Sequence, residues 1–278
     1  MVKPFMIALI VMLVAAESVA ASPPPWAKGL QACGEGIGQS AETGDLIVLS
    51  DATRVRLASV KAPELWPEGA AYKSWPHAGT ARRALAALIK DLPLALYCDG
   101  KRQNRRGETV AHMTIAGEEW LQEVLVYSGH VMVMPDAGGR MDPGALYAAE
   151  DQARAAKHGL WRFDAMQPVQ ALTDTGESAA RAGWFQIVQG RVIKADRVGK
   201  TVYLNFGDDW KRDFTIEVPG KVQRAFARMG LDPLGFAGKT LEARGWLDWK
   251  AGPRLLLETP SQIRLLPPPS EGSSIKSE

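Results

Sequence analysis

Three charged side chains near the start of the chain have the types and spacing needed to handle a phosphate and a cation. Asp45 follows a glycine, Arg56 lies in an apolar run, and Glu64 follows a proline. A carboxylate can ligate a cation, and a guanidinium pairs with phosphate through parallel hydrogen bonds. Gathered on one small sheet, these side chains could bind a cation and a phosphate together. Lys61, which lies among these acids, opposes a bound cation.

The elements that must position these residues begin with a β-hairpin. Apolar runs at 46–49 and 55–58 flank the turn-prone residues 50–53, which is the pattern of two antiparallel strands. The loop at 65–77 is long for a turn and favours a lid or a packed surface loop. Further along, apolar periodicity predicts helices at 80–90 and 120–128 and strands at 94–98, 109–115 and 131–134. A third helix is predicted to start with Asp142 as N-cap and Pro143 at its first position, and to end before Gly159.

A basic loop at 101–107 leads into the strand predicted at 109–115. It contains Arg105 and Arg106, which are candidate phosphate-binding residues. A charged loop is more often simply solvated, so both interpretations stay open. The four histidines show no metal-ligand spacing, and we assign them no role.

Several segments resemble the staphylococcal-nuclease-like, or thermonuclease, family, and together they cover about residues 43–161. The matching segments, in the family's order, are Thr43 to Asp45, Arg54 to Leu57, Val60 to Glu64, Asn104 to Ala111 and Lys157 to Trp161. The resemblance implies an OB-type barrel with helices, and a calcium-dependent hydrolysis of DNA or RNA. By position it implies that Asp45 ligates calcium with help from the Ala62 carbonyl, that Arg56 grips the phosphate, and that Glu64 directs the water.

Two positions depart from the family pattern. Lys61 stands where a second calcium aspartate is expected, and Glu108 stands where a second phosphate arginine is expected. Calcium usually takes more than one carboxylate, so Lys61 predicts an impaired metal site. Two hypotheses follow: a calcium-dependent nuclease with reduced or lost activity, or a non-catalytic module that binds nucleic acid or a protein of the cell envelope. Whether the chain is an enzyme stays open.

A second strand-rich block follows a linker predicted at 164–183. It has five strand candidates at 185–193, 201–206, 214–218, 240–246 and 254–258, with a helix at 221–229 between the third and fourth. This is the order of an OB-type barrel. The block also resembles, more weakly, a C-terminal module of some bacterial envelope proteins. Its aromatics can stack bases, but core or rim positions are the commoner use of such residues.

The predicted fold class is therefore mainly β with helices, with two OB-like barrels in tandem. The domains expected are a lead-in at 22–42, a thermonuclease-like domain at 43–163, an OB-like domain at 184–267 and a disordered tail at 268–278. A net charge of +2 is too small to imply nucleic-acid binding by itself.

The N-terminus reads as a signal peptide at 1–21, which predicts a periplasmic or secreted protein. Lys3 precedes an apolar run at 5–14, and small residues at 18–21 offer a cleavage site. The run is shorter than the roughly 20 apolar residues that a membrane helix needs, so no stable span is expected after cleavage. In an oxidising compartment, Cys33 and Cys98 are expected to form a disulfide.

Overall fold

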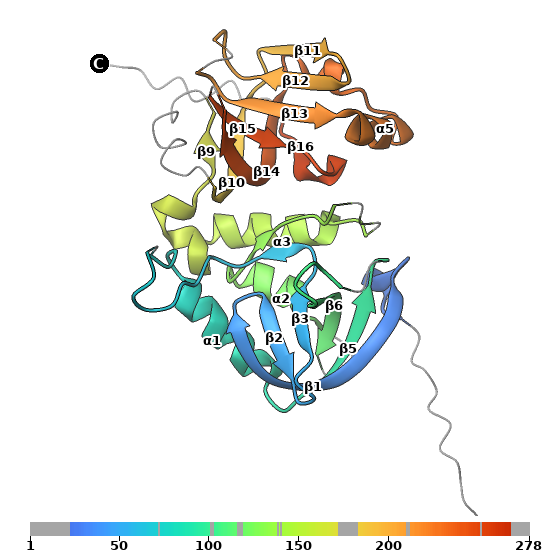
Figure 1. Ribbon diagram of the computed structural model, residues 1–278, viewed down its shortest axis with the longest axis vertical. Helices are drawn as coiled ribbons and strands as arrows, with labels where there is room; N and C mark the ends of the chain where they lie inside the picture. The colour runs from blue at the N-terminus through green and yellow to red at the C-terminus, as the bar shows by residue number, and fades with distance from the viewer. Residues whose placement is uncertain are drawn as a thin grey trace, which may run out of the picture.

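The computed structural model describes residues 23–267, except 72, 101–102, 116–118, 138, 140, 172–182, 210–211 and 251. The predicted signal peptide and C-terminal tail therefore lie outside the described residues. The chain folds into an N-terminal barrel with helices and a second β-sheet domain, with α3 (Gly144–Ala155) lying between them (Figure 1). No helix in the described part of the chain is both long and apolar enough to cross a membrane.

The N-terminal domain is a closed barrel of strands in the order β3-β2-β1-β5-β6, completed by parallel pairing of β3 with β6. The strands are β1 (Gln31–Thr43), β2 (Leu46–Leu49), β3 (Arg54–Leu57), β5 (Pro93–Cys98) and β6 (Thr109–Ile115), and β7 (Glu119–Trp120) extends the sheet beside β6. Helix α1 (Ala78–Ile89) connects β3 to β5. Ile47, Val55, Leu57 and Leu85 fill the core and are almost fully buried, which explains the apolar periodicity that predicted these elements.

The prediction of a lead-in at 22–42 is wrong, because the greater part of this segment belongs to strand β1. The strand pairs with β2 and with β5, so it forms the centre of the sheet. Most of its side chains are exposed and it contains glycines, and these features hide a strand from pattern analysis. Gly38 is required for close packing, since a Cβ there would lie 2.2 Å from the carbonyl oxygen of Ile89 at the end of α1.

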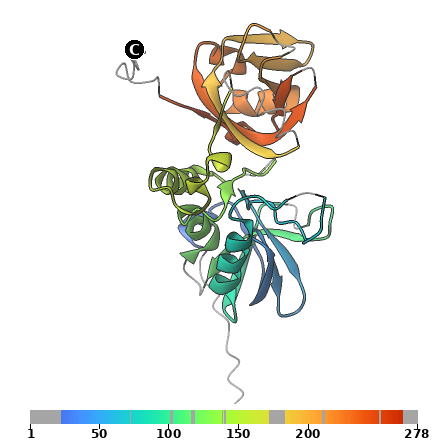
Figure 2. The same cartoon turned by 90° about the vertical axis from the view of Figure 1, so that its left-hand side faces the viewer.

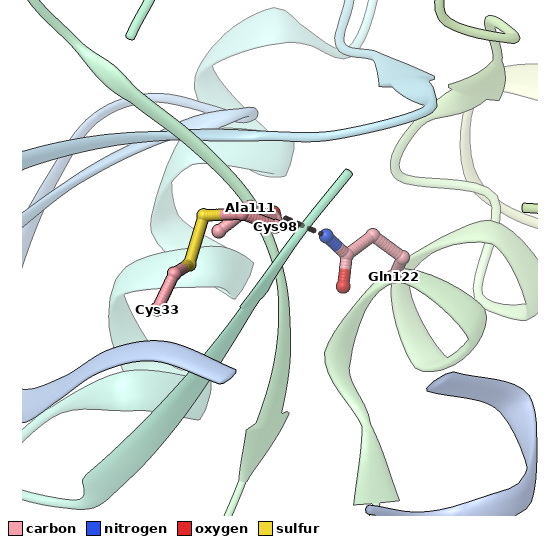
Figure 3. The surroundings of a disulfide bond; sticks show 4 residues. All are labelled: Cys33, Cys98, Ala111 and Gln122. Atoms are coloured by element: carbon pink, nitrogen blue, oxygen red, sulfur yellow. Dashed lines mark hydrogen bonds between the residues drawn. A yellow bond between two sulfur atoms is a disulfide. The ribbon is translucent and has the colours of Figure 1, made fainter. Parts of the chain in front are cut away.

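The disulfide expected between Cys33 and Cys98 is present in the structure and ties the first part of β1 to the end of β5 (Figure 3). On the other side of β5, Ala111 of β6 accepts a hydrogen bond of 3.0 Å from the side-chain amide of Gln122 in α2 (Leu121–Tyr127). The disulfide thus links two neighbouring strands of the barrel wall, and the hydrogen bond attaches α2 to the next strand, β6. Short 3-10 turns at Pro25–Ala27, Gly159–Arg162 and Asp164–Met166 complete this part of the chain.

Helix α3 starts at Gly144, and Pro143 precedes it, so Asp142 is not its N-cap residue as predicted. The Asp142 carboxylate instead accepts a hydrogen bond of 3.0 Å from the Gly144 amide, a short-range turn that holds the same region. Beside α3, the short strand β8 (Met132–Val133) pairs antiparallel with β4 (Val60–Lys61). This small ladder carries the chain that follows β3 toward the second domain.

The second domain contains a sheet whose strand order is consistent with an OB-like fold. The path is β11-β12-β13-β15-β14-β10-β9, in which β13 and β15 are parallel and β16 also pairs with β14. The strands are β9 (Val169–Gln170), β10 (Phe185–Arg191), β11 (Lys194–Val198), β12 (Thr201–Asn205), β13 (Thr215–Pro219), β14 (Thr240–Trp249), β15 (Pro253–Leu256) and β16 (Ile263–Leu265). Helix α5 (Gly220–Arg228) follows β13, and 3-10 turns occur at Pro233–Phe236 and Pro260–Gln262.

The first part of the predicted linker at 164–183 is ordered. Val169 and Gln170 form β9, which runs parallel to β10 and so belongs to the second sheet, while 172–182 lie outside the described residues. An apolar cluster joins the two domains where they meet on either side of α3 (Figure 2). It contains Trp75, Met132, Ala153, Leu160, Trp161, Met166, Phe185 and Ile187. The domains are therefore packed against each other through a shared core.

Candidate functional site

Asp45 lies in the turn just before β2 and is almost fully buried, with 2 % of its surface exposed. Its Oδ1 accepts hydrogen bonds of 2.6 Å from the Thr43 hydroxyl and from Arg56 Nη1. Its Oδ2 accepts one of 3.0 Å from the Ala62 amide. The preceding Gly44 leaves room for this turn, since a Cβ there would lie 2.8 Å from the Cβ of Ala62. Both carboxylate oxygens are therefore already in use.

Arg56 extends from β3 and is bound by acids on two sides. Its Nη1 pairs with Asp45, while Nε and Nη2 donate in parallel to the two oxygens of Glu108, at 3.1 Å each. Burial works to lower the pKa of Arg56, but attraction to Asp45 and the hydrogen bonds to Glu108 outweigh it and raise the pKa above its ordinary value. The guanidinium fork that suits a phosphate is filled by a carboxylate of its own domain.

Glu108 stands just before β6 and is 1 % exposed. Besides Arg56, it accepts a hydrogen bond of 2.7 Å from the side-chain amide of Asn104, whose own oxygen accepts from the Glu108 backbone amide at 3.1 Å. Arg54 Nη2 lies 3.5 Å from it. Burial raises the pKa of Glu108, but the bonds from Arg56 and Asn104 prevail and lower it, which keeps the carboxylate ionised.

Lys61 lies on β4 and its ammonium is placed between two acids. Its Nζ is 2.7 Å from Glu64 Oε1 and 3.7 Å from Asp45 Oδ2. The residue is 9 % exposed, whereas the Glu64 side chain is 27 % exposed. The ring of Trp246, from the second domain, lies over the ammonium with its centroid 5.8 Å away. A fixed positive charge thus occupies the space between Asp45 and Glu64.

These side chains form one connected group, which we call the charge cluster: Asp45, Arg56, Lys61, Glu64 and Glu108. Acids and bases alternate through it, so each charge has an oppositely charged neighbour. At its edge, Arg54 also pairs with Glu42 at 2.6 Å. Among the described residues, no group of three or more His, Cys, Asp or Glu side chains is arranged to hold a metal ion.

The structure brings together the predicted residues Asp45, Arg56 and Glu64 and leaves Arg105 and Arg106 outside the cluster. Both arginines are exposed in the loop before Glu108. Sequence reasoning missed Asn104 and Trp246. The turn-forming segment 104–107 carried a signal for Asn104, since asparagine often bonds to the backbone of such turns. Trp246 carried none, because it comes from the other domain.

Comparisons with known proteins give the family of the N-terminal domain. The model of the staphylococcal nuclease homologue family matches residues 54–163. No curated protein matches the chain. The matched range contains β3, the Lys61–Glu64 turn and Glu108. It includes both β3 and β6, the two strands whose pairing closes the barrel. Residues 54–163 of this chain are therefore a staphylococcal nuclease-like domain, which relates this part of the chain to the nuclease family.

Proposed function

We propose that this protein is exported and that its nuclease-like domain acts as a binding module that does not hydrolyse phosphodiesters. The observation that carries the proposal is the pairing of Arg56 with Asp45 and Glu108. Phosphodiester hydrolysis needs positive groups that are free to neutralise the phosphate. Here a phosphate would have to displace two carboxylates, one of them held in a bidentate pair.

The donor set around Asp45 does not fit the calcium ion that such a domain implies. Calcium takes six to eight oxygen ligands, and both Asp45 oxygens are already engaged. The Lys61 ammonium is 3.7 Å from one of them. A divalent ion about 4 Å from an ammonium is repelled by roughly 8 kcal/mol at an effective dielectric constant near 20, before the loss of a ligand is counted.

A cleavage assay on the mature protein tests the proposal. Wild type, Glu64→Gln and the double variant Lys61→Asp/Glu108→Arg are incubated with single-stranded DNA and RNA, with calcium or with a chelator. We expect wild type to cleave no faster than Glu64→Gln, with or without calcium. Calcium-dependent cleavage by wild type that is lost in Glu64→Gln would overturn the proposal.

Calorimetric titration with calcium tests the metal argument separately from activity. Lys61→Asp removes the ammonium and supplies a carboxylate, so we expect it to bind calcium more tightly than wild type. Glu217→Asp, which changes an acid in the second domain, serves as the control and should match wild type. Equal calcium affinities for Lys61→Asp and wild type would count against the assigned role of Lys61.

Nucleic acid is one candidate ligand for this non-hydrolysing binding module, and the exposure of Arg105 and Arg106 favours it. Fluorescence anisotropy with a labelled single-stranded oligonucleotide tests it. If both arginines contact phosphates, Arg105→Ala/Arg106→Ala reduces the salt slope of the binding constant by about 1.4. Arg224→Ala/Arg228→Ala removes the same charge from exposed positions on α5 and is the matched control. Equal slopes in both double variants would exclude this candidate.

Export is supported by the charged and apolar pattern of residues 1–21 and by the disulfide, which suits an oxidising compartment. Cell fractionation followed by N-terminal sequencing of the recovered protein tests it. We expect the mature chain in the envelope fraction or the medium, beginning at Ala21 or Ser22. Full-length protein in the cytoplasmic fraction would contradict export.

A further inference from the structure

The second domain meets the nuclease-like domain along one face of α3, and the contacts on this face are polar. The helix residues that make them recur at the period of an α-helix, at 147, 150, 151 and 154. Tyr147 donates to the Ser261 carbonyl, Glu150 pairs with Arg244, Asp151 pairs with Arg264, and Arg154 pairs with Glu242. A neighbouring face, with Leu146 and Ala149, belongs to the core of the first domain, to which Tyr147 also contributes. Helix α3 is therefore the joint between the domains.

Arg244 of β14 is the centre of this joint and is fully buried. Its Nη1 donates to the Val133 carbonyl at 2.8 Å and to Glu150 Oε1 at 3.1 Å, and its Nη2 donates to Glu150 Oε2 at 2.9 Å and also to Glu242. The Val133 amide donates to Glu150 Oε1 at 2.8 Å. Both backbone polar groups of Val133 are thus held at the domain interface.

Val133 connects the interface to the charge cluster through one ladder. It lies on β8, which pairs with β4, so that Val60 is opposite Val133 and Lys61 is opposite Met132. The Met134 amide extends the ladder with a bond of 2.9 Å to the Ser59 carbonyl. The strand that carries Lys61 is therefore attached directly to the strand that Arg244 holds.

Trp246 lies two residues after Arg244 on β14, and its ring contacts the ammonium group at the end of the Lys61 side chain. Its ring is 5.8 Å from the Lys61 ammonium and rests edge-on against buried Phe185, at a centroid distance of 6.1 Å. An aromatic face attracts an ammonium at this distance. Trp246 is 48 % exposed, so this contact with the cluster leaves part of the residue open to solvent.

We propose that Arg244 and Trp246 are positioning residues that hold Lys61 between Asp45 and Glu64, so that the site of this protein is built by both domains. A lysine side chain has many rotamers, and fixing it costs conformational entropy. The backbone anchor at Val133 and the ring over Nζ restrict it from both ends. A ligand that approaches Glu64 beside this ammonium meets Trp246 of the second domain. This inference holds whether or not the cluster hydrolyses phosphodiesters.

Competitive acylation of lysines, read by mass spectrometry on the intact mature protein, tests the role of Trp246. Trp246→Ala is expected to raise the acylation rate of Lys61 several-fold, while exposed Lys90 keeps its rate. Trp249→Ala is the matched control, because Trp249 is on the same strand and 43 % exposed. An unchanged Lys61 rate in a folded Trp246→Ala protein, or an equal rise in Trp249→Ala, would overturn this role.

Hydrogen exchange tests the role of Arg244. Arg244→Lys keeps the charge but loses the planar fork, and we expect exchange at 59–62 and 132–134 to rise by about tenfold. Arg254→Lys is the control, because Arg254 pairs with Glu217 and Asp248 within its own domain. If Arg244→Lys does not fold, Arg244→Met/Glu150→Met removes both charges together, and the same rise is expected. Unchanged exchange at both segments in the folded variant would overturn the proposal.

Discussion

At the scale of single residues, the charge cluster is a set of buried and half-buried acids and bases that pair with one another. Asp45 and Glu108 are nearly inaccessible, and each has a guanidinium partner and at least one further hydrogen-bond donor. Burying an ion pair costs desolvation that its attraction only partly offsets, whereas removing one partner leaves an uncompensated buried charge. The complete cluster therefore costs little stability, whereas loss of any one member is expected to be destabilising.

Glu108→Ala is expected to lower the free energy of unfolding by about 3 kcal/mol, because it leaves Arg56 with half of its partners in a buried site. Glu42→Ala is the control. Glu42 makes a comparable bond to Arg54, but both side chains are more than 40 % exposed, so its loss is expected to cost less than about 1 kcal/mol. Urea denaturation of both variants measures the difference. Equal losses would show that burial does not strengthen the pairing of Glu108.

The fold should lose stability in mild acid because of buried His112. Burial lowers the pKa of His112 to about 4, although the negative charge of Asp99 acts in the opposite direction and raises it. Between pH 6.5 and about 4, the unfolded chain takes up a proton that the folded chain refuses, so stability falls as pH falls, by up to about 3 kcal/mol from this residue. Burial lowers the pKa of His77 to about 4 as well, and its effect has the same sign.

Asp136 opposes this trend. Burial raises its pKa to about 6, so the folded chain binds its proton before the unfolded chain does, and stability is gained as pH falls from 6 toward 4. The pKa of His130 is also lowered by burial, so three histidines with lowered pKa values oppose one aspartate with a raised pKa, and a net loss of stability is predicted. Chemical denaturation at pH 7, 6, 5 and 4 measures the slope, and His112→Asn should make it shallower. A slope that His112→Asn leaves unchanged would contradict the assignment.

At the scale of elements, the barrel depends on β1, the barrel strand with the smallest proportion of apolar side chains. It is held on one side by pairing with β2 and on the other by pairing with β5. The disulfide between Cys33 and Cys98 adds a covalent link to the second pairing, with a sequence separation of 65. This link compensates for the small amount of apolar surface that β1 can bury.

Cys33→Ser/Cys98→Ser is expected to lower the free energy of unfolding by up to about 4 kcal/mol, the value that the chain-entropy model gives for a loop of this length. Thermal and urea unfolding of oxidised wild type and of the double variant measure the loss. Wild type treated with a reductant provides the control, since it should approach the double variant. The expectation would be contradicted if the double variant were as stable as oxidised wild type while reductant still destabilised the wild type.

At the scale of the whole molecule, the two domains share one interface that combines an apolar cluster with the buried ion pairs of Arg244. Trp75 of the first domain stacks on Trp184 of the second at a centroid distance of 4.8 Å. Buried ionic contacts of this kind favour one docking geometry over others more than they add net stability. The arrangement places Trp246 at the charge cluster and keeps it there.

Because of this shared interface, we expect the mature wild-type protein to unfold in one calorimetric transition. Arg244→Ala removes one of the two guanidinium partners that Glu150 and Glu242 share, the other being Arg154, and should lower the stability by about 3 kcal/mol or more, or split the transition in two. Differential scanning calorimetry measures both effects. The control is Arg254→Ala, which acts within the second domain and should keep a single transition. Two transitions in wild type would show that the domains unfold independently.

The sequence by itself determined the local elements and the family of the first domain. Apolar periodicity located the hairpin at 46–58, the strand at 109–115 and the helices, because burial of one face leaves that pattern in the chain. Short motifs led to the prediction that Asp45, Arg56 and Glu64 lie at functional positions and marked Lys61 and Glu108 as departures from the family pattern. Strand β1 escaped detection because its side chains are small and exposed, and its place in the barrel comes from backbone pairing alone.

Only the tertiary structure decided what the charged residues do. Lys61 lies between Glu64, three residues away, and Asp45, and Glu108 binds the arginine that a phosphate would need. The contacts of Lys61 with Asp45 and of Glu108 with Arg56 join residues that are far apart in the chain. The approach of Trp246 and the burial of Arg244 depend on how the two domains dock. Charge pairing and docking are long-range interactions that leave no periodic signal in the sequence, and they fix the geometry of this site.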